Sequence, residues 1–160
     1  LLGKPIDLFQ SINFLSPSRQ RTHSDFIHMT TFPTGNLIAI WIALEDMSLK
    51  NGPLHYYPSS QKLPHILNKE YNNEGNRFFI GNQTYDKYEN KVEEVIQENK
   101  LIKEVFVAKK GDVLIWHANL LHGGEKVLND ELTRKSMVFH YYAKDVICYH
   151  EIKQRPTLRE

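Results

Sequence analysis

The chain contains a histidine and an aspartate at a spacing that could bind a metal ion. His23 and Asp25 lie two residues apart in RTHSDFIHMT (residues 21–30), and the Thr, Phe and Ile content there predicts a strand over residues 21–31. Residues two apart in a strand are roughly 6.7 Å apart and point to the same face, so an imidazole and a carboxylate could converge on one ion. Taken alone, a polar strand face explains the pair more simply, because two ligands are too few for a facial metal site.

A second set of polar residues lies in the later part of the chain, between residues 111 and 136. The segment GDVLIWHANLLHGG (residues 111–124) contains His117 and His122, and the next predicted strand opens with Arg134 and Ser136. Two histidines and one carboxylate on one face of an octahedral ion leave three positions open, as in non-heme iron(II) oxygenases. An arginine can grip a carboxylate through two parallel hydrogen bonds, and a serine on the same face can add a third. A co-substrate that chelates iron at one end and presents a carboxylate at the other, such as 2-oxoglutarate, would need this arrangement.

The remaining pattern predicts a mostly β domain that would position these side chains. Periodicity and turn residues predict strands over residues 37–46, 54–57, 104–109, 112–117 and 134–143, with an edge strand over 145–152. Residues 37–46 (LIAIWIALED) are apolar on both faces, which is typical of a central strand covered on both sides. Residues 85–100 have helical spacing instead and predict a surface helix without chemistry of its own. Many short strands with one inserted helix indicate an all-β sandwich or small barrel.

Composition excludes several classes of protein. Lys plus Arg (20) balances Asp plus Glu (19) among 160 residues, which gives no electrostatic argument for nucleic acid or an anionic membrane. One cysteine, Cys148, excludes an internal disulfide framework. There is no run of 18 apolar residues, and LLGKPIDLFQ at the start lacks the order of a signal peptide, so we expect no membrane span and a cytoplasmic location.

The motifs, in their order, resemble the phytanoyl-CoA dioxygenase (PhyH) family of Fe(II)/2-oxoglutarate oxygenases. The resemblance extends from about Arg21 to Tyr142. It rests on five blocks, namely HSD (23–25), IAIWIALED (38–46), NGPL (51–54), GDVLIWHANLLHGG (111–124) and TRKSMVFHYY (133–142). It implies a double-stranded β-helix, that is, a jelly-roll or cupin-like barrel. We expect residues 1–160 to form one such domain and to lack the family's N-terminal helical region.

The resemblance also implies a role for particular residues. The implied iron(II) ligands are His23, Asp25 and His122, and the implied 2-oxoglutarate contacts are Arg134, Ser136 and Trp41. His117 competes with His122, but only His122 precedes the Gly-Gly and has the family's position relative to the arginine. His28 and His140 match no motif, and we expect both to be structural.

The implied activity is hydroxylation of an aliphatic carbon of a small molecule by O2, with release of succinate and CO2. Asp25 favours hydroxylation, because halogenating relatives have a small residue at the carboxylate position. Two alternatives stay open: a cupin-like metalloprotein that does not use 2-oxoglutarate, and an inactive truncated barrel. We expect substrate specificity to reside in loops within residues 58–84 and in the family's N-terminal region.

One face of the predicted central strand suggests that the protein forms an oligomer. The implied N-terminal helices would cover one sheet of the barrel, so without them part of the face of residues 37–46 would lack cover. That face comprises Ile38, Ile40, Ile42 and Leu44. We therefore expect this face to be buried by a second subunit, or the chain to be poorly soluble.

Overall fold

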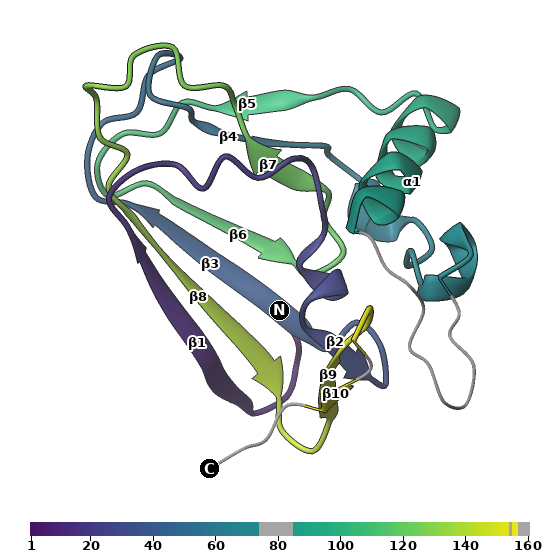
Figure 1. The fold of residues 1–160 in the computed structure, drawn as a ribbon. Helices are drawn as coiled ribbons and strands as arrows, with labels where there is room; N and C mark the ends of the chain where they lie inside the picture. Colours follow the sequence, from purple (N-terminus) through teal and green to yellow (C-terminus); the bar gives the residue numbers. More distant parts are fainter. Residues whose placement is uncertain (74–84, 154, 157–160) are drawn as a thin grey trace.

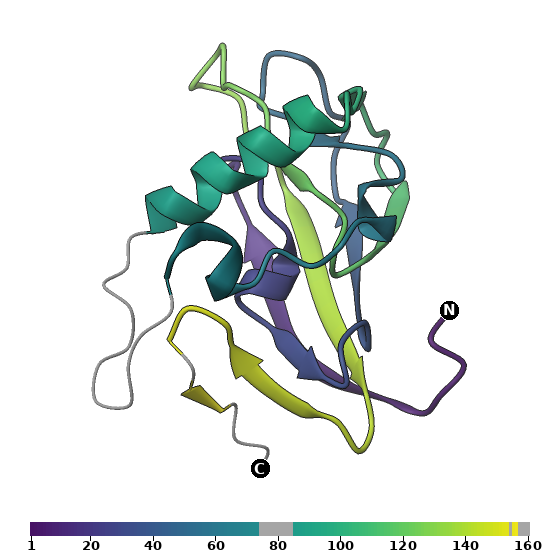
Figure 2. The same ribbon diagram turned by 90° about the vertical axis from the view of Figure 1, so that its right-hand side faces the viewer.

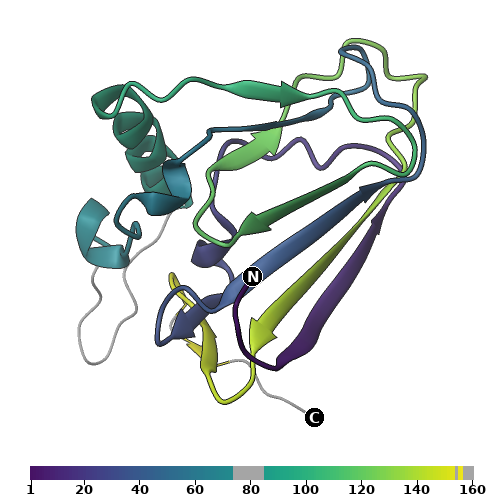
Figure 3. The ribbon, with the colours of Figure 1, turned by 180° about the vertical axis from the view of Figure 1, so that it is seen from behind.

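The computed structural model describes residues 1–73, 85–153 and 155–156. Two antiparallel sheets diverge from the turns that join them and face each other across the core (Figures 1 and 3). The four-stranded sheet has the order β1 (Ile6–Phe14), β8 (Ser136–Ala143), β3 (Leu37–Ala43) and β6 (Val113–His117). The opposing sheet has the order β5 (Glu104–Phe106), β4 (Leu54–Tyr56) and β7 (His122–Gly124). This arrangement confirms the predicted β-rich barrel of the double-stranded β-helix type.

A small third sheet and the helices lie at the open end between the two main sheets. The third sheet has the order β10 (Arg155–Pro156), β9 (Ile147–His150) and β2 (Thr30–Phe32). Figure 2 shows the helices gathered on this side of the molecule. They are the α-helix α1 (Tyr85–Glu98) and the 3₁₀ helices η1 (Asp25–Ile27), η2 (Ser60–Lys62) and η3 (Asn68–Tyr71). None of the described helices is both long and apolar enough to cross a bilayer.

Strand β3 has one fully buried face and one partly exposed face. Leu37, Ala39, Trp41 and Ala43 are at most 2% exposed and face the core between the sheets. On the opposite face Ile40 and Ile42 are only half-buried, and they pair with Ile115 and Val113 of β6, which are each 47% exposed. Within the single chain this side is therefore not fully covered, contrary to the pattern of the strand alone but as expected for a barrel that lacks part of its cover. We call the exposed side the outer face; it comprises Ile38, Ile40, Ile42, Val113, Ile115 and Phe139.

The predicted strand over residues 21–31 is wrong for most of its length. His23 makes a single antiparallel bridge to His122, Asp25 begins η1, and only residues 30–32 form a strand. The backbone curls because the carbonyl of Asp25 accepts the N–H groups of both His28 and Met29, at 3.0 Å each. This curl buries residues 26 and 27 in two different core clusters. Core packing has thus overridden the β propensity of this run.

The other predicted elements are present with shifted ends. The five later strand predictions correspond to β4, β5, β6, β8 and β9, and the helix prediction corresponds to α1. Neither β1 nor the short β7 was predicted. Of the 58–84 loop, the described part contains η2 and η3, whereas residues 74–84 lie outside the described residues.

Candidate metal centre and co-substrate pocket

The backbone brings the two histidines of the candidate metal centre together. The N–H of His23 donates to the carbonyl of His122 at 2.9 Å, and the reverse bond is also 2.9 Å. His122 begins β7, so the opposing sheet fixes this residue, and the bridge ties the segment of His23 to the same sheet edge. Asp25 enters from the first residue of η1. His23 and Asp25 therefore meet His122, which is distant from them in sequence, at the open end of the barrel.

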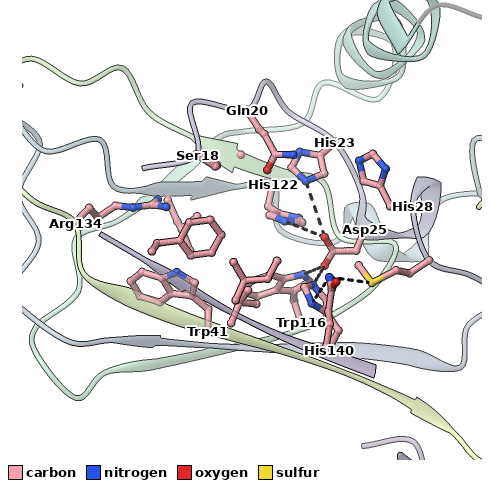
Figure 4. Close-up of a pocket in the computed structure, with 17 residues that line it drawn as sticks. Ser18, Gln20, His23, Asp25, His28, Trp41, Trp116, His122, Arg134 and His140 are labelled. Atoms are coloured by element: carbon pink, nitrogen blue, oxygen red, sulfur yellow. Dashed lines mark hydrogen bonds and ion pairs between the residues drawn. The ribbon is translucent and has the colours of Figure 1, made fainter. Parts of the chain in front are cut away.

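The three side chains form a cluster that could hold one metal ion. One potential ligand atom from each of His23, Asp25 and His122 lies within 4.8 Å of the others. Asp25 Oδ1 is 3.9 Å from His23 Nε2 and 3.6 Å from His122 Nε2. Figure 4 shows the three side chains converging. All three are at most 7% exposed, so the cluster is screened from bulk water.

Backbone hydrogen bonds select the nitrogen that each histidine presents. His23 Nδ1 lies 2.8 Å from the carbonyl oxygen of Arg21, and His122 Nδ1 lies 3.0 Å from that of Leu120. A carbonyl oxygen can only accept, so each Nδ1 carries the proton and each Nε2 keeps a free lone pair. Metal-binding histidines commonly have this arrangement, in which the second nitrogen is anchored. The donor set therefore fits a divalent ion held by two imidazoles and one carboxylate.

Side chains on the far side of Asp25 from the two histidines also orient its carboxylate. Trp116 Nε1 donates to Asp25 Oδ2 at 2.7 Å, and His140 Nε2 lies 3.4 Å from the same oxygen. Gln10 Nε2 lies 3.2 Å from His140 Nδ1 and can donate to it, which fixes the other ring nitrogen. Oδ2 is thereby engaged, and Oδ1 is left to face the two histidines.

Electrostatics match a metal-binding role for these groups. Burial, together with the neighbouring His122, lowers the pKa of His23 to about 4, so its imidazole is neutral near pH 7. Burial alone would raise the pKa of Asp25. Its interactions with His122 and His140 outweigh burial and hold the pKa of Asp25 below its usual range. At neutral pH the site therefore presents an ionised carboxylate and a neutral imidazole, the forms that bind metal.

A cavity of about 310 Å³ extends from this cluster to a buried arginine. It is lined by the three clustered residues and by Trp41 and Arg134. Arg134 is 1% exposed; its Nη1 donates to the carbonyl of Gly52 at a long 3.3 Å. Within the described part of the chain, Arg134 Nε and Trp41 Nε1 are buried without a hydrogen-bond partner. Buried donors are normally satisfied, so these two fit an anionic ligand that would enter the cavity.

Two other residues considered in the sequence analysis, Ser136 and His117, do not belong to the metal cluster or to the described cavity lining. The buried Ser136 is not among the described residues that line the cavity, and its hydroxyl donates to the carbonyl of Arg134 at 3.5 Å. His117 lies away from the cluster, with Nε2 3.2 Å from the carbonyl of Gly35. Of the two competing histidines, the structure therefore groups His122 with His23 and Asp25.

Sequence reasoning missed several side chains of the site, among them His140, Trp116 and His28, which was expected to be structural but lines the cavity. His140 was expected to be structural, but it lines the cavity and contacts Asp25. Its position on β8 has the same parity as Arg134 and Ser136, and that signal could have found it. Trp116 lies within the motif of residues 111–124 but was given no role, because nothing local shows that its indole reaches Asp25, 91 residues away along the chain.

The chain is similar in sequence to known proteins. The chain is 28% identical to human peroxisomal phytanoyl-CoA dioxygenase, over all of this chain and 42% of that protein. It is 29% identical to bovine phytanoyl-CoA dioxygenase domain-containing protein 1, over 74% of this chain and 37% of that protein. The chain thus spans less than half the length of these relatives.

Solved structures share the fold at lower sequence identity. The 2-oxoglutarate-dependent carbocyclase SnoK of nogalamycin biosynthesis superposes with a TM-score of 0.71 and 16% identity, over 99% of this chain and 62% of that chain. Iron-bound EctD from S. alaskensis gives a TM-score of 0.59 and 19% identity, over 89% of this chain and 47% of that chain. The sequence profile of phytanoyl-CoA dioxygenase (PhyH) matches residues 6–136. With most of its length matched, the chain belongs to the phytanoyl-CoA dioxygenase family.

Proposed function

We propose that the protein is an Fe(II)/2-oxoglutarate-dependent dioxygenase that hydroxylates an aliphatic carbon of a small molecule and releases succinate and CO2. One observation supports this most strongly. The cavity has a candidate metal cluster at one end and two unsatisfied donors, Arg134 Nε and Trp41 Nε1, elsewhere in its wall. A 2-oxo acid with a second carboxylate has the groups to satisfy both. A cupin-like metalloprotein without 2-oxoglutarate would give the buried Arg134 no ligand.

Each residue has a defined part in this proposal. His23, Asp25 and His122 would hold iron(II), which when bound supplies chelation of the 2-oxo acid and activation of O2. Arg134 would hold the distal carboxylate through charge-assisted hydrogen bonds, and its burial excludes the water that would compete for it. Ser136 is not among the described residues that line the cavity, and its hydroxyl donates to the backbone of Arg134, so its contact with 2-oxoglutarate stays a prediction.

The cavity lining supports an uncharged substrate. Apart from the three predicted ligands, its described lining has only three ionisable side chains, which are those of Arg134, His28 and His140. Burial lowers the pKa of His28 to about 4, so it is neutral near pH 7. The other polar lining groups are also neutral: the side chains of Gln10, Ser18 and Gln20 and the indole N–H groups of the two tryptophans. This lining does not supply the basic groups that would bind the phosphates of an acyl-CoA.

The test is oxygenation with matched variants. The chain is incubated with Fe(II), 2-oxoglutarate, ¹⁸O₂ and a library of uncharged small molecules, and succinate and product mass are measured. We expect iron-dependent succinate and one ¹⁸O atom in a product. Asp25→Ala should abolish both, whereas His117→Ala, which changes a histidine outside the cluster, should preserve both. Succinate formation that survives Asp25→Ala would refute the proposal.

A further inference from the structure

Helix α1 contacts the short segment that carries two of the three predicted iron ligands. Tyr88 of α1 is fully buried, and its hydroxyl oxygen accepts the backbone N–H of Ser24 at 2.9 Å. The same oxygen lies 3.0 Å from Ser24 Oγ, close enough for a second hydrogen bond. Ser24 is 2% exposed and stands between His23 and Asp25. One tyrosine hydroxyl therefore satisfies both a backbone and a side-chain group of the residue between the ligands.

A second contact from α1 reaches the other side of His23. The Arg21 guanidinium pairs with Glu89 at 2.7 Å and also with Glu93, one helical turn further along α1. The carbonyl of Arg21 is the group that accepts the Nδ1 proton of His23, at 2.8 Å. Helix α1 is thus joined to the residues on both sides of His23.

Apolar packing extends the same contact toward the third ligand. Tyr88 and Val92 share one buried cluster with Ile27 and Leu121. Ile27 lies in η1 with Asp25, and Leu121 directly precedes His122. The buried side of α1 therefore packs on the neighbours of the ligands as well as on Ser24.

We propose that Tyr88 is a positioning residue for the metal centre: through its hydrogen bonds to Ser24 it fixes the separation and aim of His23 and Asp25. The inference rests on the proposed metal site. Replacing the hydroxyl by hydrogen leaves the Ser24 N–H buried without an acceptor, so the backbone between the two ligands must shift to find one. A shift there moves both ligand side chains. Helix α1 then affects metal binding through Ser24, contrary to the expectation that this helix has no chemistry of its own.

The experiment compares two tyrosine variants. Tyr88→Phe removes the hydroxyl that contacts Ser24. Tyr71→Phe is the matched control: Tyr71 lies in the same cluster, 5.9 Å from Tyr88 between ring centroids, and its buried hydroxyl donates to Asn68 at 2.7 Å within η3. Co²⁺ is titrated calorimetrically into the unmodified chain and both variants. The visible spectrum of bound Co²⁺ and the melting temperature of each metal-free protein are recorded.

The expected results separate positioning from general stability. Removing a group that hydrogen-bonds a metal ligand directly typically weakens metal binding 10- to 100-fold. Tyr88 acts on the ligands through Ser24, so we expect the Kd for Co²⁺ in Tyr88→Phe to rise by the lower end of this range, about tenfold. We expect its Co²⁺ spectrum to change as well. Tyr71→Phe should lower the melting temperature of the metal-free protein without changing either metal readout.

Three outcomes would decide against the inference in different ways. Equal Co²⁺ affinity in Tyr88→Phe and the unmodified chain would overturn it and leave the proposed function standing. An unmodified chain that does not bind Co²⁺ would overturn both. If Tyr88→Phe does not fold, Ser24→Ala removes the side-chain half of the contact and is expected to weaken Co²⁺ binding severalfold; unchanged affinity in that variant would also overturn the inference.

Discussion

Replacing Arg134 by methionine would remove the charge that we assign to the distal carboxylate of 2-oxoglutarate and keep a side chain of similar length. In the structure this guanidinium is 1% exposed, and its polar contact is the 3.3 Å bond from Nη1 to Gly52. It also lies 5.8 Å from the centroid of the Phe14 ring, and burial lowers its pKa to about 10. The charge is therefore weakly compensated by the protein itself, and a bound carboxylate would supply the acceptor that Nε lacks.

The size of the effect follows from the kind of bond that is lost. A hydrogen bond to a charged group contributes about 1.5–3 kcal/mol, and a tenfold change in affinity corresponds to about 1.4 kcal/mol. We therefore expect Arg134→Met to weaken 2-oxoglutarate binding about ten- to hundredfold. Because replacing a poorly compensated buried charge by an apolar side chain is often neutral or stabilising, the metal-free variant should be at least as stable as the parent.

The assay compares two 2-oxo acids on the Co²⁺-loaded chain. 2-Oxoglutarate has a distal carboxylate and pyruvate does not, so calorimetric titration with both isolates the contribution of that group. Arg134→Met should lose most of the preference for 2-oxoglutarate and keep its affinity for pyruvate. Arg19→Met is a suitable control, since Arg19 is exposed and pairs with Asp130. If Arg134→Met retained the parent's preference for 2-oxoglutarate over pyruvate, the assignment of this arginine would be refuted.

Three further predictions concern the metal ligands, pH and association. Trp116→Phe removes the 2.7 Å bond to the carboxylate ligand, so Co²⁺ affinity measured by calorimetry should fall about tenfold. Burial lowers the pKa of both His23 and His28 to about 4, so between pH 6.5 and 4 the unfolded chain binds more protons than the folded chain. Denaturant unfolding of the metal-free chain should therefore show full stability above pH 6.5 and a loss on the order of a few kcal/mol by pH 4. The apolar outer face should cause concentration-dependent association in light scattering.

Each of these expectations has a clear contrary result. Unchanged Co²⁺ affinity in Trp116→Phe would show that metal binding does not depend on the hydrogen bond from Trp116 to the carboxylate. A free energy of unfolding that is flat between pH 6.5 and 4 would show that the two buried histidines titrate normally in the folded state. A monodisperse monomer at all concentrations would remove the argument for a second subunit on the outer face.

Sequence periodicity predicted the elements whose burial is regular. Strand β3 was found as a continuous apolar run and α1 by its single apolar stripe, both with small errors at their ends. Strand β1 was missed because its alternation is interrupted by an irregularity between Leu8 and Gln10. Strand β7 is only three residues long and contains Gly123 and Gly124, which strands disfavour.

The proximity of His23, Asp25 and His122 was predicted more successfully than the local structure that brings them together. His23 and Asp25 do converge, but through a single bridge and the start of η1, not because they share one face of a strand. Motif order was sufficient to group them with His122. The contacts of Trp116 with Asp25 and of Tyr88 with Ser24 could not be predicted, because each joins residues more than 60 positions apart and depends on how the elements pack.

Anomalous diffraction from crystals grown with Co²⁺ would test the central claim most directly. We predict one strong anomalous peak that is bonded to Nε2 of His23, Nε2 of His122 and Oδ1 of Asp25, and that is absent from crystals of His122→Ala. A peak at another site, or an imidazole of His122 turned away from Asp25 in the metal-loaded protein, would contradict the account.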